Sequence, residues 1–182
     1  EILEVYKGTK YDDVAISEIN FDGLDVHCFA AGTQITMADN STKNIEQIAK
    51  DDWILTFDNA TNKLTKIQVS ELIQTRHSNL LKLKFSDREI ITTDDHPFWT
   101  VDKNWASLNP NKSNNNYDQD TDVKQLVIGD KVFVASENKF IDLIDIEKIV
   151  DEQITFTLEL TTGNNFIANG LLVKTERPKW TN

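Results

Sequence analysis

The chain has 182 residues, of which 39% are hydrophobic and 27% charged, and it carries a net charge of −11. This composition and size fit one folded domain with an appendage. The acidic balance would repel a phosphate backbone, and no apolar run approaches the roughly 20 residues that cross a bilayer. We therefore expect a monomer with no nucleic-acid and no membrane partner. Residues 1–27 lack the layout of a secretory signal peptide, which leaves the compartment open.

Most of the chain is predicted to form strands. In chain order, residues 1–27 contain apolar positions that could pack on the domain as a strand, and residues 41–49 predict one short helix capped by Ser41 or Thr42. Residues 109–122 are rich in Asn and Asp and predict a mobile surface loop. Runs of β-branched and aromatic residues bounded by turn residues predict strands over Trp53–Phe57, Lys66–Ile73, Leu80–Phe85, Lys131–Ala135 and Phe140–Val150. The fold class is therefore all-β.

A weak internal repeat relates two parts of the chain. Residues Ala49–Leu55 resemble Val127–Phe133, and in both a turn that ends in Asp introduces an apolar strand. A turn followed by a strand is common in all-β proteins, so the match alone is weak evidence for two related halves.

Three distant segments carry candidate chemistry. Cys28 is followed by small residues and Gly32, which allow a backbone to approach the thiol closely. Residues 92–99 (TTDDHPFW) place Thr93 and His96 three positions apart after a predicted strand. In residues 163–173 (GNNFIANGLLV), Asn169-Gly170 stands between apolar triplets, which is a strong hairpin signal.

Together these segments resemble the opening, second and closing blocks of the hedgehog/intein (Hint) family. The resemblance covers residues 28–175, with residues 1–27 and 176–182 as flanking segments. It implies a horseshoe-like all-β fold with pseudo-twofold halves and no homing-endonuclease insert. It is also compatible with a parent protein on the surface of, or secreted by, a bacterium.

The resemblance implies self-processing in cis. The thiol of Cys28 would attack the carbonyl of His27 to give a thioester, because a thiol is an intrinsically strong nucleophile. Thr93 would stabilise the oxyanion through its hydroxyl or its N–H, and His96 would protonate the amine of Cys28. The substrate is the protein's own flanking segment, the resolving nucleophile is water, a thiol or an amine, and no cofactor or metal is expected.

Three positions depart from the splicing pattern. Lys174 and Thr175 stand where inteins carry His-Asn, and a threonine cannot cyclise to a succinimide. Thr157 stands where many relatives carry an aspartate that assists the first step. We therefore expect cleavage of the upstream bond without normal splicing.

Other interpretations remain open at this point. The first is a degenerate, non-catalytic Hint-like module that binds another domain. A cysteine hydrolase acting on separate substrates, or an N-terminal nucleophile hydrolase, fits the blocks less well. His27 is expected to be an exposed linker residue, Asp94 and Asp95 turn residues, and His77 structural.

Overall fold

Strands dominate the part of the chain that the computed structural model describes, residues 26–116 and 122–175. This confirms the all-β prediction. The described residues include no helix long and apolar enough to cross a membrane. The elements are β1 Phe29–Ala30, β2 Gln34–Thr36, β3 Thr42–Asn44, a 3-10 turn Ile45–Gln47, β4 Trp53–Asp58, β5 Lys63–His77, β6 Leu80–Phe85, β7 Glu89–Thr92, β8 Phe98–Thr100, β9 Asn104–Ser107, α1 Pro110–Asn116, β10 Lys124–Gln125, β11 Lys131–Val134, β12 Lys139–Ile149, β13 Gln153–Leu160, β14 Asn165–Ala168 and β15 Leu171–Lys174.

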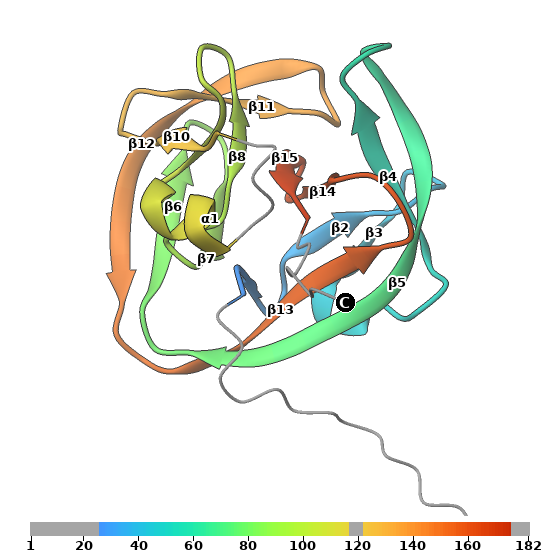
Figure 1. Cartoon of the computed structure of the whole chain (residues 1–182), viewed down its shortest axis with the longest axis horizontal. Coiled ribbons are helices and arrows are strands. Elements are labelled where there is room, and N and C mark those ends of the chain that lie inside the picture. The colour runs from blue at the N-terminus through green and yellow to red at the C-terminus, as the bar shows by residue number, and fades with distance from the viewer. Residues whose placement is uncertain (1–25, 117–121, 176–182) are drawn as a thin grey trace, which may run out of the picture.

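Three long strands give the molecule its curved outline. β5, β12 and β13 run around the outside, and shorter strands such as β8, β14 and β15 lie within them (Figure 1). The strand order is β3-β2-β14-β15-β8-β11-β12-β6-β7-β1-β13-β5-β4, with β9 and β10 joined through β8. Long strands twist and bend as they pair, so one continuous order can close around a core.

The internal repeat is visible as two turns with the same hydrogen bonds. The carboxylate of Asp52 accepts the N–H of Ala49 at 2.8 Å, and that of Asp130 accepts the N–H of Val127 at 2.8 Å. Each of the two aspartates also pairs with a lysine that lies earlier in the chain. The repeat therefore reflects two structurally related halves, as the pattern of the sequence suggested.

The core is built on three phenylalanines from distant strands. Phe29, Phe98 and Phe166 are almost fully buried, and the ring centroid of Phe29 lies 6.5 Å from that of Phe98 and 6.1 Å from that of Phe166. Both pairs meet edge to face, an arrangement favoured by the ring quadrupoles. This contact fixes β1 against β8 and β14, and with it the start of the domain.

Two expectations about local structure are wrong. Residues 42–44 pair with β2 as strand β3, and only Ile45–Gln47 form a 3-10 turn in place of the predicted helix. Residues 110–116 form helix α1 where a loop was expected, because Asn109 accepts the N–H of Lys112 and Pro110 suits the first helical position. The expected strand within residues 1–25, and residues 117–121 of the expected loop, lie outside the described residues.

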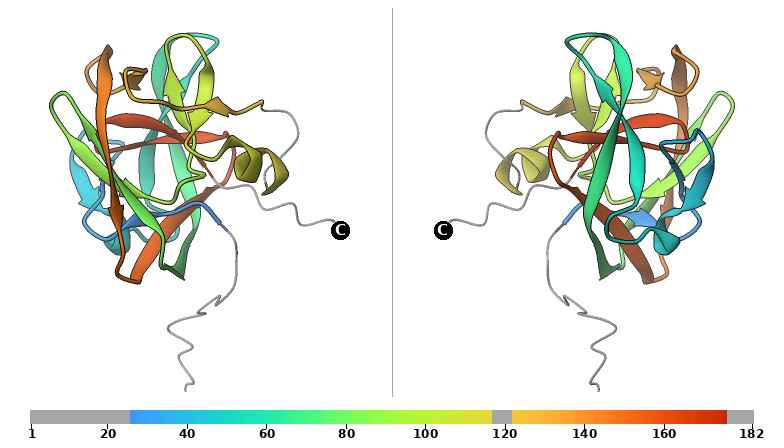
Figure 2. Two further views of the ribbon diagram at one scale, coloured as in Figure 1. Left: turned by 90° about the vertical axis from the view of Figure 1, so that its left-hand side faces the viewer. Right: turned by 90° about the vertical axis from the view of Figure 1, so that its right-hand side faces the viewer.

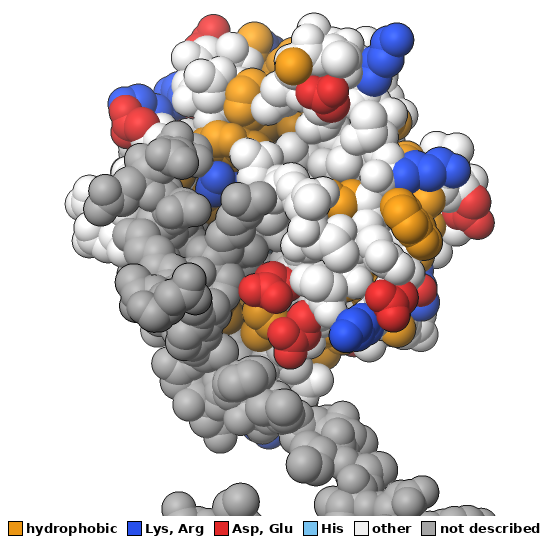
Figure 3. All heavy atoms as spheres, turned by 45° about the vertical axis from the view of Figure 1, so that its right-hand side comes forward, with side chains coloured by type: hydrophobic (Ala, Val, Ile, Leu, Met, Phe, Trp, Pro, Cys, Tyr) orange, Lys and Arg blue, Asp and Glu red, His pale blue; other side chains and the backbone are white. Residues whose placement is uncertain are grey.

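Charged side chains of both signs are interspersed on the surface (Figure 3). One network joins Asp87, Arg88, Glu137 and Lys139. Hydrogen bonds from Arg88, then from Lys139, hold the pKa of Asp87 well below its usual range. Arg88 also donates from Nη1 to the carbonyl of Asn169 at 3.0 Å, so the network supports the β14–β15 turn.

The β14–β15 hairpin forms as predicted, and its turn depends on glycine. Asn169 has φ 48° and Gly170 has φ 79°, both in the left-handed region that two-residue hairpin turns require. A Cβ at Gly170 would contact the guanidinium of Arg88, and would lie 2.8 Å from the hydroxyl of Ser136. The turn therefore has room only for glycine.

Gly170→Ala is expected to lower the free energy of unfolding by about 1–3 kcal/mol, from backbone strain and the displaced Arg88. The matched control is Gly129→Ala, which has φ 95° but open space around its Cβ position, and so adds only backbone strain. Urea denaturation midpoints of both variants check this. Equal losses for the two would show that the contact with Arg88 carries no cost.

Candidate functional site

Strand β1 brings the three predicted segments together. Phe29 pairs with Thr92 of β7 on one side and with Phe156 of β13 on the other. The N–H of Cys28 donates to the hydroxyl of Thr93 at 3.1 Å. The carbonyl of Cys28 accepts the N–H of Thr93 at 3.0 Å and the hydroxyl of Thr92 at 3.0 Å. The backbone of Cys28 is thus held by the turn that follows β7.

The contacts of Thr93 place it beside the backbone of Cys28. Its hydroxyl and its N–H are both bonded to the backbone of Cys28, and its own carbonyl accepts the N–H of His96 at 3.4 Å. Its hydroxyl lies on the nitrogen that would leave when the His27–Cys28 bond breaks. If this bond were cleaved, Thr93 would therefore act on the leaving nitrogen.

The side chain of Cys28 lies in an apolar environment. It has no exposed surface, and it packs with Val26 and Ile73. Continuing the register of β1 and β13 places Thr157 opposite Cys28, and Thr157 also pairs with Ile73 of β5. The hydroxyl of Thr157 is buried and has no hydrogen-bond partner among the described residues. Thr157 thus places a buried hydroxyl without a hydrogen bond beside the cysteine.

Two imidazoles meet at one backbone carbonyl. Nε2 of His96 lies 3.1 Å from the carbonyl oxygen of Lys174, and Nε2 of His27 lies 3.3 Å from the same oxygen. The two ring centroids are 4.2 Å apart in an edge-on arrangement. A carbonyl oxygen only accepts, so both Nε2 atoms carry the proton. In neutral His96, Nδ1 then holds a lone pair, and it has no hydrogen-bond partner among the described residues.

His27 is not an exposed linker residue, and that expectation is wrong. Its side chain is fully buried, and burial lowers the pKa of His27 to about 4 against a partial upward effect of Asp95. Burial, followed by the neighbouring His27, also lowers the pKa of His96 well below its usual value, although the bond to Lys174 opposes this. Both rings are therefore neutral near pH 7.

Helix α1 supports the turn that carries Thr93 and His96. The carbonyl of Asp94 accepts the N–H of Asn109 at 2.9 Å, and the carbonyl of Asp95 accepts the hydroxyl of Ser113 at 2.6 Å. The ammonium group of Lys112 lies 3.4 Å from the buried carboxylate of Asp95. The helix lies against the outside of the strands (Figure 2). Sequence reasoning missed Asp95 and Lys112, although Asn109-Pro110 is a helix-start signal.

The two closing positions point into the fold rather than toward a downstream bond. The hydroxyl of Thr175 donates to the carbonyl of Leu158 at 2.6 Å. The ammonium group of Lys174 lies 5.7 Å from the ring centroid of Trp105, within the range of a cation–π contact. The carbonyl of Lys174 lies within hydrogen-bond distance of both histidines. His77, expected to be structural, bonds through Nδ1 to the hydroxyl of Thr155 at 2.7 Å.

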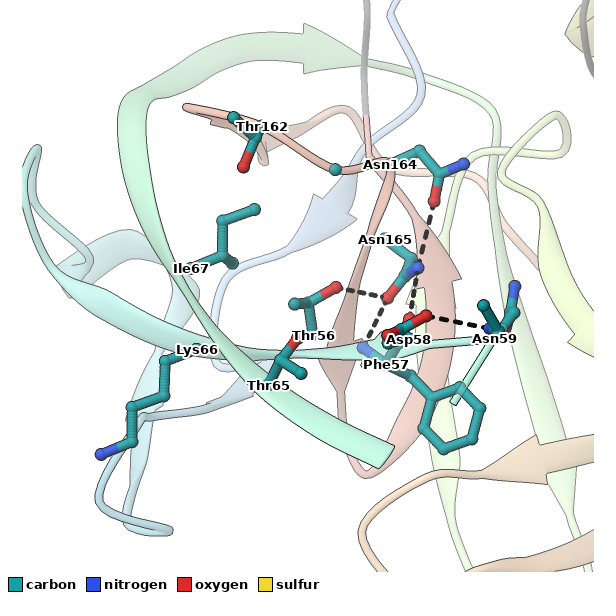
Figure 4. Close-up of a pocket in the computed structure, with 12 residues that line it drawn as sticks. Thr56, Phe57, Asp58, Asn59, Thr65, Lys66, Ile67, Thr162, Asn164 and Asn165 are labelled. Atoms are coloured by element: carbon teal, nitrogen blue, oxygen red, sulfur yellow. Dashed lines mark hydrogen bonds between the residues drawn. The ribbon is translucent and has the colours of Figure 1, made fainter. Parts of the chain in front are cut away.

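A separate cavity of about 450 Å³ lies between β4, β5 and the segment before β14, lined in part by Thr56, Phe57 and Asn165 (Figure 4). The amide oxygen of Asn165 accepts the hydroxyl of Thr56 at 2.7 Å and the N–H of Phe57 at 2.9 Å, so these polar groups are satisfied internally. Neither Cys28 nor His96 lines this cavity. The candidate chemistry therefore lies elsewhere, at the buried junction between β1, β7 and β15.

Comparison with solved structures defines the fold as that of inteins and intein-like domains. The bacterial intein-like domain from Clostridium thermocellum matches with a TM-score of 0.68 and 21% identity, over 81% of this chain and 98% of that one. The DnaB intein from Synechocystis sp. PCC 6803 matches with a TM-score of 0.68 and 20% identity, over 84% of this chain and 100% of that one. The gp41-1 intein matches with a TM-score of 0.63 and 20% identity, over 82% and 99%. The Hint-type fold without an endonuclease insert is confirmed.

A family model described as the Ataxin-1 and HBP1 module (AXH) matches residues 29–137. This is more than half of the chain, and the chain belongs to that family. The match begins one residue after Cys28 and ends before the β14–β15 hairpin, so it covers neither end of the candidate site. No curated protein matches the sequence significantly.

Acid is expected to destabilise the domain through the buried histidines. A histidine with a lower pKa in the folded state binds fewer protons when folded, so its stability contribution is full above about pH 6.5 and falls as the pH drops. For His27, with its pKa lowered to about 4, the loss between pH 7 and pH 5 is about 2 kcal/mol. Urea denaturation at the two pH values measures it. His27→Gln should remove about that part of the difference, and an unchanged difference would contradict the assignment.

Thr157→Val is expected to raise the free energy of unfolding by about 1 kcal/mol, because it replaces a buried hydroxyl that has no hydrogen bond with a methyl group. The matched control is Thr155→Val on the same strand, whose buried hydroxyl donates to the carbonyl of Thr75 at 3.2 Å. That variant should lose about 1 kcal/mol. Thermal and urea denaturation of the pair test the contrast, and a loss at both positions would mean that Thr157 is satisfied in solution.

Proposed function

We propose that the domain cleaves its own chain at the His27–Cys28 bond through a thioester on Cys28. One observation carries the proposal: the hydroxyl of Thr93 lies 3.1 Å from the amide nitrogen of Cys28, the atom that must leave. The intein-like fold supports it, because in this chain that fold holds Cys28 next to the turn that carries Thr93 and His96.

The first step is an N-to-S acyl shift. The sulfur of Cys28 bonds to the carbonyl carbon of His27, the C–N bond breaks, and the thiol proton ends on the freed amine. The Nδ1 lone pair of His96 is a suitable acceptor for that proton, and the resulting imidazolium can return it to the nitrogen as the nitrogen becomes basic. The hydroxyl of Thr93, hydrogen-bonded to that nitrogen, orients it for this transfer. Neutral imidazoles suit this role, because a protonated ring has no lone pair to use.

The second step resolves the thioester without splicing. Water, a thiol or an amine attacks the acyl carbon, the C–S bond breaks, and the segment ending at His27 is released. Thr175 cannot cyclise as an asparagine does, and its hydroxyl is committed to the carbonyl of Leu158. The downstream bond is therefore expected to stay intact. The chemistry needs no metal or cofactor, and the substrate is the flanking segment of the same chain.

A second candidate function is a non-catalytic β module with a decayed site. One observation favours it: the thiol of Cys28 is fully buried with Val26 and Ile73, and an external nucleophile would need local opening to reach the acyl carbon. This candidate predicts no thioester. It also predicts full stability for variants that keep the packing around Cys28.

Incubation of the purified chain with hydroxylamine or dithiothreitol, followed by intact-mass measurement, tests the proposal. The expected product is a fragment that ends at His27, formed faster with hydroxylamine than in buffer alone. Cys28→Ala should abolish it, and Thr93→Val should slow it about tenfold or more, because it removes the hydroxyl at the leaving nitrogen.

Thr92→Val is the matched control, since the hydroxyl of Thr92 contacts the carbonyl of Cys28 rather than its nitrogen. It should retain most of the cleavage rate. An unchanged mass for the wild-type chain under every nucleophile would overturn the proposal and leave the non-catalytic module.

A further inference from the structure

His27, the residue before the scissile bond, is enclosed by the domain. Its side chain has no exposed surface and contacts groups from two separate segments, the ring of His96 and the carbonyl of Lys174, while the nearby Asp95 acts on it electrostatically. A flanking residue in an extended chain would normally be solvated. Complete burial of a polar ring requires that the domain supply partners for it.

We propose that these groups form a binding subsite for the side chain of the residue before Cys28, and that the subsite selects a flat side chain that donates a hydrogen bond. The proposal rests on the self-cleavage proposed above, since the subsite would define which upstream residue the domain accepts. The ring of His27 donates from Nε2 to the carbonyl of Lys174, and its edge packs on His96 at 4.2 Å between centroids.

The subsite is selective because each of its three groups favours a different property of the side chain that binds there. The carbonyl of Lys174 accepts a hydrogen bond from Nε2 of His27, and an apolar ring at this position could not donate that bond. The edge-on contact with His96 favours a flat side chain. Asp95, paired with Lys112 of α1, places a buried acidic group near the ring, which disfavours an upstream Asp or Glu.

Occupation of the subsite also positions the reacting bond. His27 supplies the acyl carbon that the thiol of Cys28 attacks, so fixing its side chain restricts rotation of that carbonyl relative to the sulfur. Correct placement of a reacting group contributes to rate even when the group does no chemistry itself. His27 is therefore a positioning residue within the substrate, and its ring also shares the Lys174 carbonyl with His96.

Rates of hydroxylamine cleavage in a series of His27 variants test the subsite. His27→Gln keeps a flat donor of similar reach and should stay within about threefold of the wild-type rate. His27→Phe keeps the ring without the donor, and His27→Ala removes both, so each should fall by about fivefold or more, the effect of one lost buried hydrogen bond.

His77→Gln is the matched control, because His77 lies at the end of β5 and bonds to Thr155 rather than to the site. It should cleave at the wild-type rate. Circular dichroism and urea denaturation of each variant establish that it is folded at the assay temperature. Folded His27→Ala or His27→Phe chains that cleave as fast as wild type would overturn the subsite.

A second measurement does not depend on cleavage. In the Cys28→Ala chain, which cannot form a thioester, long-range proton–nitrogen NMR spectra report the tautomer of His27. The subsite predicts an Nε2-protonated neutral ring throughout pH 5.5–7.5, whereas an exposed ring would titrate near pH 6.5. Titration in that range overturns the subsite. Absence of cleavage in the wild-type chain, with the ring still neutral, overturns the proposed function alone.

Discussion

The arrangement depends on how the backbone of Cys28 is held between β7 and β13. The N–H and the carbonyl of this residue are both bonded to the turn that starts at Thr92, and the next residue pairs with strands on both sides. These bonds place the thiol, the amide that joins His27 to Cys28 and the Thr93 hydroxyl in one buried volume. They join Cys28 and Thr93, which lie 65 positions apart in the sequence. The long outer strands and the phenylalanine core serve to keep this junction closed.

Much of the fold could be predicted from the sequence because its strongest signals are local. Alternation of apolar residues located the strands, and Asn169-Gly170 located the final hairpin through its demand for positive φ. Residues 109–116 were mistaken for loop, because their helix is held by bonds to Asp94 and Asp95 rather than by an apolar face of its own. Such tertiary support leaves no periodic trace in a sequence.

The sequence indicated candidate residues but not how their side chains are directed. Spacing within the second segment indicated Thr93 and His96, but no pattern could show that the hydroxyl of Thr93 lies on the backbone nitrogen of Cys28. Burial of His27 was also missed. The local sequence around a histidine does not reveal whether its ring contacts water or a carbonyl 147 residues away. The family model and the structural likenesses agree on β architecture, while only the latter extend over the closing hairpin.

The imidazole of His27 lies 3.3 Å from the carbonyl oxygen of Lys174, so residues just before and at the end of the domain are in contact. A domain whose two connections leave from neighbouring points can be inserted in a surface loop of another protein without separating the ends of that loop. This contact would suit residues 28–175 to such an insertion. Tolerance of the insertion would then depend on the loop that receives it rather than on the size of the domain.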